Sequence, residues 1–93
     1  MTTDQSLPAT TFRLPENLDL RGAARLASEL HALRGRAICL DASGVASIGA
    51  LCLQVLLSAR ITWEADGVPL TVVTPSTPFM DAMRLFGATF LAD

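Results

Sequence analysis

Side chains able to do acid–base or nucleophilic chemistry are few and scattered in this sequence. His31 is the only histidine, and a lone histidine on a helix flank is usually solvated or packed. Asp41 has no second carboxylate, lysine or histidine nearby in sequence, so we expect it to hydrogen-bond the loop at Ser43 and Gly44. Ser43 and Ser47 lack a G-x-S-x-G frame, and the glycines form neither a phosphate loop nor a dinucleotide fingerprint. The sequence therefore predicts no enzyme.

The two cysteines offer no redox or metal chemistry. Cys39 and Cys52 are thirteen residues apart, without a C-x-x-C pattern or clustered histidines. We expect Cys39 in a strand and Cys52 on the core face of a helix, both as reduced, buried thiols. No metal and no cofactor are expected.

Composition indicates one ordered domain over residues 1–93, with residues 1–9 flexible or extended. Hydrophobic residues make up 51% of the chain and charged residues 17%, which is typical of a globular domain. The formal net charge of −2 gives no general attraction to nucleic acid or to an anionic membrane. The polar, acidic start is unlike a signal peptide, and the longest apolar-rich run, 48–59, is too short to span a bilayer. We therefore expect a cytoplasmic protein.

Strands and helices alternate along the chain, which predicts an α/β fold with parallel βαβ units. The expected strands are residues 10–14, 37–42 and 70–74, the second of them buried on both faces. Asp19 is expected to cap a helix over 20–33, and Gly67 to end a helix over 48–65. Thr77 is expected to cap a last helix that has Pro78 as its first residue and ends at Gly87. Residues 88–91 are either a final short strand or a tail.

The helix expected over 48–65 carries apolar residues on two faces. At about 100° per residue, one face is the natural core side and comprises Ile48, Cys52, Val55, Leu56, Ala59 and Trp63. The opposite face holds Ala50, Leu53, Leu57 and Ile61, flanked by Arg60 and Glu64. Neighbouring helices could cover this second stripe, or scattered leucines could simply be exposed. The alternative is a protein-binding patch, because contiguous exposed apolar area usually marks an interface.

The order of these motifs resembles the STAS domain, the fold shared by anti-sigma-factor antagonists and the cytoplasmic tails of sulfate transporters. The resemblance spans nearly the whole chain: Leu18-Asp19, Asp41-Ala42-Ser43-x-Val45, Gly67, Thr77-Pro78 and Leu85-Phe86-Gly87. It implies a mixed or parallel sheet of four to five strands with helices packed mainly on one face. It also implies a loop of the form D-S/T-S/T-G, whose first hydroxyl is phosphorylated by a partner kinase.

The matching positions here are Gly49, Ala50, Leu51 and Cys52, so the family's phosphoacceptor position is Ala50, which has no oxygen to phosphorylate. Ser47, three residues earlier, is a conceivable substitute.

The run DASGVASIGALCLQVLLSA, followed by Trp63-Glu64 and Asp66-Gly67, is similar to small stand-alone STAS proteins encoded among bacterial chemotaxis genes. That similarity implies a non-enzymatic partner of the chemotaxis histidine kinase that helps drain phosphoryl groups from a response regulator. The implied binding surface comprises Ser47, Gly49, Ala50, Leu53, Gln54, Leu57, Arg60 and Ile61. The alternatives are an anti-sigma-factor antagonist without phosphoregulation, a lipid-transport accessory STAS subunit, and a structural homodimer.

Overall fold

The computed structural model describes residues 10–87, which form eight elements in which one or two strands precede each helix. In chain order they are β1 (Thr10–Arg13), β2 (Asn17–Leu18), α2 (Gly22–Ala32), β3 (Ile38–Asp41), β4 (Ser47–Ile48), α3 (Ala50–Asp66), β5 (Leu70–Val73) and α4 (Thr77–Leu85). The predicted α/β class is confirmed. The expected strand or tail over 88–91 lies outside the described residues.

Within the described part of the chain the strands form two parallel sheets instead of one sheet of four to five strands. The main sheet has the order β1-β3-β5, with Phe12 beside Leu40 and Leu40 beside Val72. The two-residue strands β2 and β4 pair with each other, Asn17 beside Ser47. They come from the loops that follow β1 and β3, so they extend the carboxyl end of the sheet as a separate ribbon.

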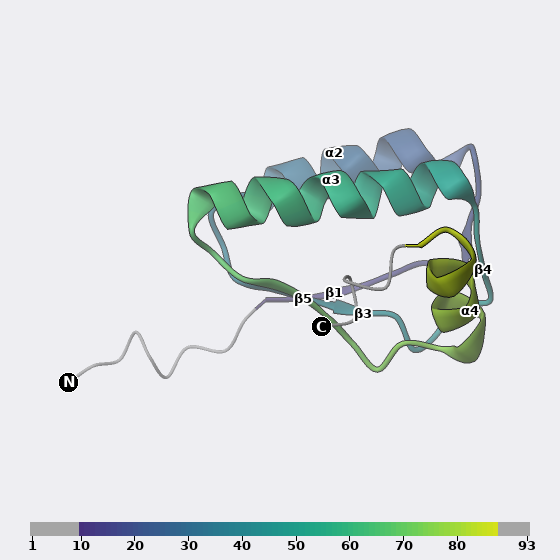
Figure 1. Ribbon diagram of the computed structural model, residues 1–93. Coiled ribbons are helices and arrows are strands. Elements are labelled where there is room, and N and C mark those ends of the chain that lie inside the picture. Colours follow the sequence, from purple (N-terminus) through teal and green to yellow (C-terminus); the bar gives the residue numbers. More distant parts are fainter. Residues whose placement is uncertain (1–9, 88–93) are drawn as a thin grey trace.

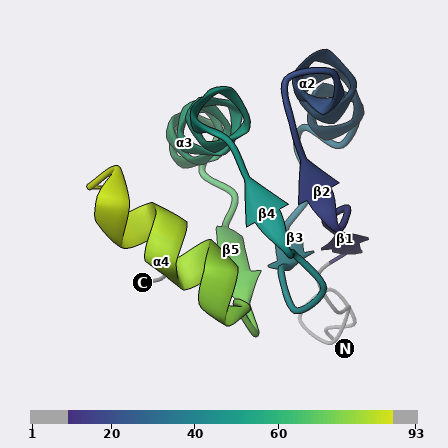
Figure 2. The same cartoon turned by 90° about the vertical axis from the view of Figure 1, so that its right-hand side faces the viewer.

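The helices α2 and α3 lie side by side over one face of the main sheet, as expected for helices packed mainly on one face (Figure 1). Figure 2 shows α4 apart from them, beside β4 and β5 at the end of the sheet, and α4 contacts β4. The carboxyl ends of the strands, the start of α3 and the whole of α4 therefore lie at one end of the molecule.

The core lies between the main sheet and the two long helices. Leu40 on β3 and Leu56 on α3 are fully buried, together with Leu26 and Leu30 of α2. Residues of β3 alternate between buried and half-buried, so the prediction that this strand is buried on both faces was wrong. Cys39 is accordingly half-buried, because α2 and α3 cover the opposite face of the sheet.

The helix ends follow the expected signals with two corrections. Asp19 Oδ1 accepts a hydrogen bond from Gly22 N at 3.1 Å, but the cap position of α2 is Arg21, which makes no side-chain cap hydrogen bond, so Asp19 bonds the turn before the helix and is not its cap. Gly67 ends α3 in the left-handed conformation with φ 73°, as expected. The residue that caps α4 is Ser76 instead of Thr77. Ser76 has the extended backbone of a cap, and its Oγ accepts a hydrogen bond from Phe79 N at 3.2 Å. Thr77 is already the first helical residue.

A candidate docking surface at the start of α3

The N-terminus of α3 has no side chain to cap it. Gly49 is the residue before the helix, with φ −89° and ψ 167°, and no side-chain hydrogen bond caps the first turn within residues 10–87. The Gly49 carbonyl accepts from Leu53 N at 3.1 Å, which begins the helical hydrogen-bond pattern. Ala50, at the family's phosphoacceptor position, is the first helical residue and is exposed. The N–H groups at this turn are therefore open to an outside acceptor.

The ribbon of β2 and β4 holds the loop before α3 in place. Glu16 O accepts hydrogen bonds from Ala46 N at 2.7 Å and from Ser47 N at 3.2 Å. Ser47 Oγ also donates a hydrogen bond to Asn17 Oδ1 at 3.0 Å, and Gly49 N donates one to Leu18 O at 2.9 Å. This backbone pairing gives the start of α3 a defined position relative to the turn before α2.

Most of the residues predicted to bind a partner are accessible, with one clear exception. Ser47, Gly49, Ala50, Gln54 and Ile61 are exposed, and Leu57 and Arg60 are half-buried. Leu53, in contrast, is only 2% exposed, so its predicted place on an exposed stripe was wrong.

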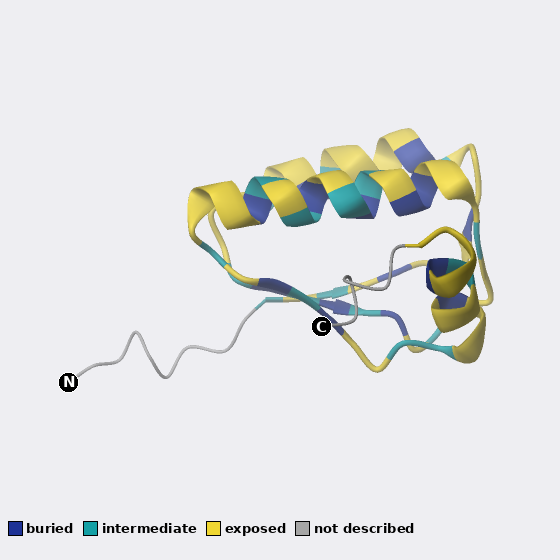
Figure 3. Ribbon diagram, viewed as in Figure 1, coloured by how far each residue is buried: buried dark blue, intermediate teal, exposed yellow. Residues whose placement is uncertain are grey.

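The error at Leu53 reflects a rotation of the buried face of α3. Leu53 belongs to the single hydrophobic core cluster, so the buried face of α3 extends round the helix to this position. On the other flank Val55, expected in the core, is only partly buried, and it lines a groove beside α2. Figure 3 shows exposed residues recurring along the outer side of α3.

Two exposed leucines near the start of α3 were missed by sequence reasoning. Leu51 is 44% exposed in the first turn of the helix, and Leu20 is 75% exposed in the turn before α2. The two turns are neighbours, because Cys52 Sγ donates to Asp19 O at 3.2 Å. Leu20 continues the spacing of the α2 apolar positions, so the sequence placed it inside a helix that in fact begins at Gly22.

We name the exposed residues at this end the α3 N-terminal surface: Leu20, Ser47, Gly49, Ala50, Leu51 and Gln54. It combines two exposed leucines with an uncapped helix N-terminus. Such a surface suits a partner that supplies both apolar contact and a hydrogen-bond acceptor.

Between residues 10 and 87 the titratable side chains with shifted pKa values make local contacts. Asp41 Oδ1 accepts from Ser43 N at 2.9 Å, which confirms its predicted role in the loop, and this hydrogen bond lowers the pKa of the Asp41 carboxyl. Burial, followed by the charge of Asp19, raises the pKa of the Cys52 thiol. His31 is exposed on α2. Among residues 10–87 no three histidine, cysteine or acidic side chains gather as a metal site.

None of the helices between residues 10 and 87 has the length and apolar character needed to cross a bilayer.

Comparison with known proteins places the chain in a family. A family model described as "Mlab, STAS domain" matches residues 1–91. No curated protein and no solved structure matches the chain significantly. The match covers almost the entire sequence, and the α/β architecture agrees with it. The chain therefore belongs to the STAS domain family, whose members are generally non-enzymatic binding modules.

Proposed function

We propose that this STAS domain docks constitutively on a chemotaxis histidine kinase in the cytoplasm and assists the drain of phosphoryl groups from a response regulator. The observation that carries the proposal is the α3 N-terminal surface, where Leu20 and Leu51 flank the uncapped first turn of α3. The outer residues Leu57, Arg60 and Ile61 extend the same docking surface along the helix. Leu53 is buried, so it supports the surface from beneath without touching a partner.

Docking at this surface is not switched by phosphorylation of Ala50. A phosphoserine would place about two negative charges at the N-terminus of α3 and would alter any partner contact there. Ala50 is exposed at that position and has no hydroxyl. Ser47 carries the hydroxyl nearest to Ala50 in the sequence, and this hydroxyl donates a hydrogen bond to Asn17 Oδ1. The partner therefore meets the same surface at all times.

Binding of the purified kinase, measured by calorimetry, tests this proposal with three variants. Leu51→Asp removes apolar contact and adds a charge, and Ala50→Asp imitates the phosphorylated state of other family members. We expect Leu51→Asp to weaken binding by at least about tenfold, because burying one leucine is worth about 1.5–3 kcal/mol. We expect Ala50→Asp to weaken it too, because the added negative charge alters the partner contact at the N-terminus of α3. Ala65→Asp is the matched control, since Ala65 is an exposed alanine at the opposite end of the same helix. If Leu51→Asp and Ala50→Asp bind the kinase as tightly as Ala65→Asp does, the interface does not lie at the start of α3.

An accessory STAS subunit of a lipid transporter is the second candidate, because the matching family model carries the name Mlab. Affinity capture from the native cell, read by mass spectrometry, separates the two candidates. A histidine kinase in the captured fraction supports the first, and a transporter subunit in its place supports the second.

A further inference from the structure

Thr74 has the only positive φ of a residue other than glycine within residues 10–87, at 50°. It follows the last residue of β5, Val73, and precedes Pro75 in the short connection to α4. Threonine is β-branched, and a β-branched residue in the left-handed region is a steric outlier. A residue before proline is also driven toward extended backbone. Both effects favour an extended Thr74, which the folded domain does not allow.

The strand pairing explains why Thr74 leaves the extended region. Ala42 N donates to Val73 O at 3.2 Å, and in a regular parallel ladder the residue two positions after Val73 would donate to Ala42 O. That residue is Pro75, which has no N–H. Ser76 N donates to Ala42 O instead, at 3.1 Å, so one extra residue must be accommodated. The chain accommodates it by the strained turn at Thr74.

The same turn brings α4 to the place where its apolar side is buried. Phe79 and Met83 are 0% and 2% exposed and belong to the core cluster. Ser76 Oγ donates to Val45 O at 2.6 Å, and the helix contacts β4. We name the surface that receives these three side chains the α4 contact surface. An extended Thr74 would lead the chain straight on from β5, and α4 could not then reach the contact surface of its own domain.

A second copy of the domain offers α4 the same contact surface. Left in water, the helix would expose Phe79 and Met83, which costs a large share of the stability of a domain this small. On a second copy it regains the same hydrogen bonds and the same burial. Because α4 follows the last strand of the described chain, its exchange breaks no strand pairing. Short hinge loops under strain favour exchange of this kind.

We propose that two copies of the domain exchange α4 through an extended hinge at Thr74 and Pro75 and so form a domain-swapped dimer. Each hinge then adopts the backbone conformation that its residues favour, so the strain is relieved twice in each dimer. Association costs translational and rotational freedom, so the monomer predominates at micromolar concentration and the dimer forms at millimolar concentration. Exchange is slow in the folded protein, because α4 must first leave its own contact surface. The exchange does not depend on the proposed kinase docking.

Refolding of the purified protein from urea, at millimolar and at micromolar concentration, tests the exchange. Size-exclusion chromatography with light scattering then measures the fraction of dimer. We expect a dimer only after refolding at the higher concentration. A chain that stays entirely monomeric after millimolar refolding overturns the proposal.

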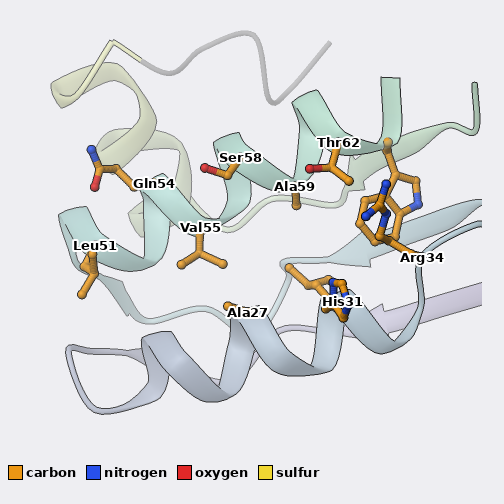
Figure 4. A pocket seen from close by; sticks show the side chains of 11 residues that line it. Ala27, His31, Arg34, Leu51, Gln54, Val55, Ser58, Ala59 and Thr62 are labelled. Atoms are coloured by element: carbon orange, nitrogen blue, oxygen red, sulfur yellow. The ribbon is translucent and has the colours of Figure 1, made fainter. Parts of the chain in front are cut away.

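Trp63, the only tryptophan, provides an internal control for the rest of the domain. It lines the groove between α2 and α3, on the side of α3 away from α4 (Figure 4), and its Nε1 donates to Arg36 O at 2.7 Å. Since exchange moves only α4, the fluorescence of Trp63 should be the same in monomer and dimer. A different emission spectrum in the dimer would mean that the core has rearranged, and would contradict the exchange of one helix.

Changes in the hinge separate this dimer from an ordinary surface dimer. Thr74→Gly adopts the left-handed turn without strain, so the dimer should weaken at least about tenfold, since strain is lost at two hinges. Thr77→Gly is the matched control, because Thr77 is exposed and lies just beyond the hinge, and it should dimerise like the wild type. Equal dimer fractions in the two variants would contradict the role of the hinge.

Shortening the hinge should have the opposite effect. Deletion of Thr74 and Pro75 leaves a connection too short for α4 to turn back to its own domain. We expect this variant to be dimeric even at micromolar concentration, and a folded monomer would overturn the proposal. Should the deletion prevent folding, the comparison of the two glycine variants still decides.

Discussion

The cap of α4 provides the sharpest test of the local structure, because Ser76 and Thr77 are adjacent hydroxyl residues with different roles. Ser76 Oγ accepts from Phe79 N at 3.2 Å and donates to Val45 O at 2.6 Å. It therefore joins the first turn of α4 to the loop that follows β3. Thr77 is exposed and is the first residue of the helix itself. We expect Ser76→Ala to destabilise the domain and Thr77→Ala to have little effect.

The size of the effect follows from the two hydrogen bonds. Loss of a serine cap costs about 0.5–2 kcal/mol, and loss of the bond to the Val45 carbonyl costs about 0.5–1.5 kcal/mol. Together they predict that Ser76→Ala lowers the free energy of unfolding by roughly 1–3.5 kcal/mol. For a domain of this size each 1 kcal/mol shifts Tm by about 4–8 °C, so Tm should fall by at least about 4 °C. A total stability of about 5–14 kcal/mol leaves the variant folded.

Thermal unfolding followed by circular dichroism measures both variants under one set of conditions. The reasoning predicts that Thr77→Ala stays within about 0.5 kcal/mol of wild type. A Thr77→Ala variant that melts as early as Ser76→Ala would refute the assignment of the cap. Ser76→Asp offers a further control, because aspartate is an equally good cap but cannot donate to the Val45 carbonyl. Its Tm should lie between those of the wild type and the alanine variant.

Four further predictions concern other parts of the domain. Leu53→Ala should cost about 2–5 kcal/mol in urea unfolding, because Leu53 is buried, whereas Ile61→Ala should stay within about 0.5 kcal/mol; the reverse ranking would mean that the outer face of α3 is misassigned. Thr74→Asn should raise Tm, because Thr74 is a β-branched residue with φ 50° directly before a proline; a lower Tm would contradict backbone strain there. In the folded protein at pH 8, the Cys52 thiol should react with iodoacetamide more slowly than the thiol of glutathione does, since burial raises the pKa of Cys52. In urea the two thiols should react at the same rate. Fast labelling of Cys52 in the folded protein would refute the burial. The pKa of Asp66 is lowered because its arginine partner hydrogen-bonds the carboxylate. Its contribution to stability is therefore present above the ordinary aspartate pKa and is lost as pH falls through the lowered value. Asp66→Asn should remove this contribution from the dependence of the unfolding free energy on pH.

Local sequence signals were sufficient for the long elements of the fold. The apolar spacing of α2 and α3 and the breaker residues Gly67, Pro69 and Pro75 placed three strands and three helices within a few residues of their observed bounds. These signals are reliable because the spacing of apolar residues, and the limits that glycine and proline set on the backbone, depend only on residues within one helix or strand. Asp41 was also placed correctly, since an aspartate that bonds a backbone N–H two residues later needs only its own loop.

The features that depend on tertiary contacts could not be predicted. The strands β2 and β4 are two residues long, too short for any periodic pattern, and they exist because Glu16 O accepts from the loop before α3. The helical wheel placed Leu53 on the face opposite the core, because a wheel does not show that the core extends round that flank. Leu20 and Leu51 became candidates only when the contact between Cys52 and Asp19 brought their turns together.

The residue types at the start of α3 bear directly on how the proposed docking works. A phosphorylatable serine at the Ala50 position would bring its own negative charge to the N-terminus of α3 once modified, and that charge would satisfy the free N–H groups from within the chain. Gly49 and Ala50 supply neither a capping oxygen nor a phosphate, so within residues 10–87 no side chain fulfils this need. These N–H groups can take water in the free protein and, in the proposed complex, an acceptor such as a partner carboxylate. Loss of the phosphoacceptor therefore removes the switch and at the same time leaves the partner's hydrogen-bonding position permanently open.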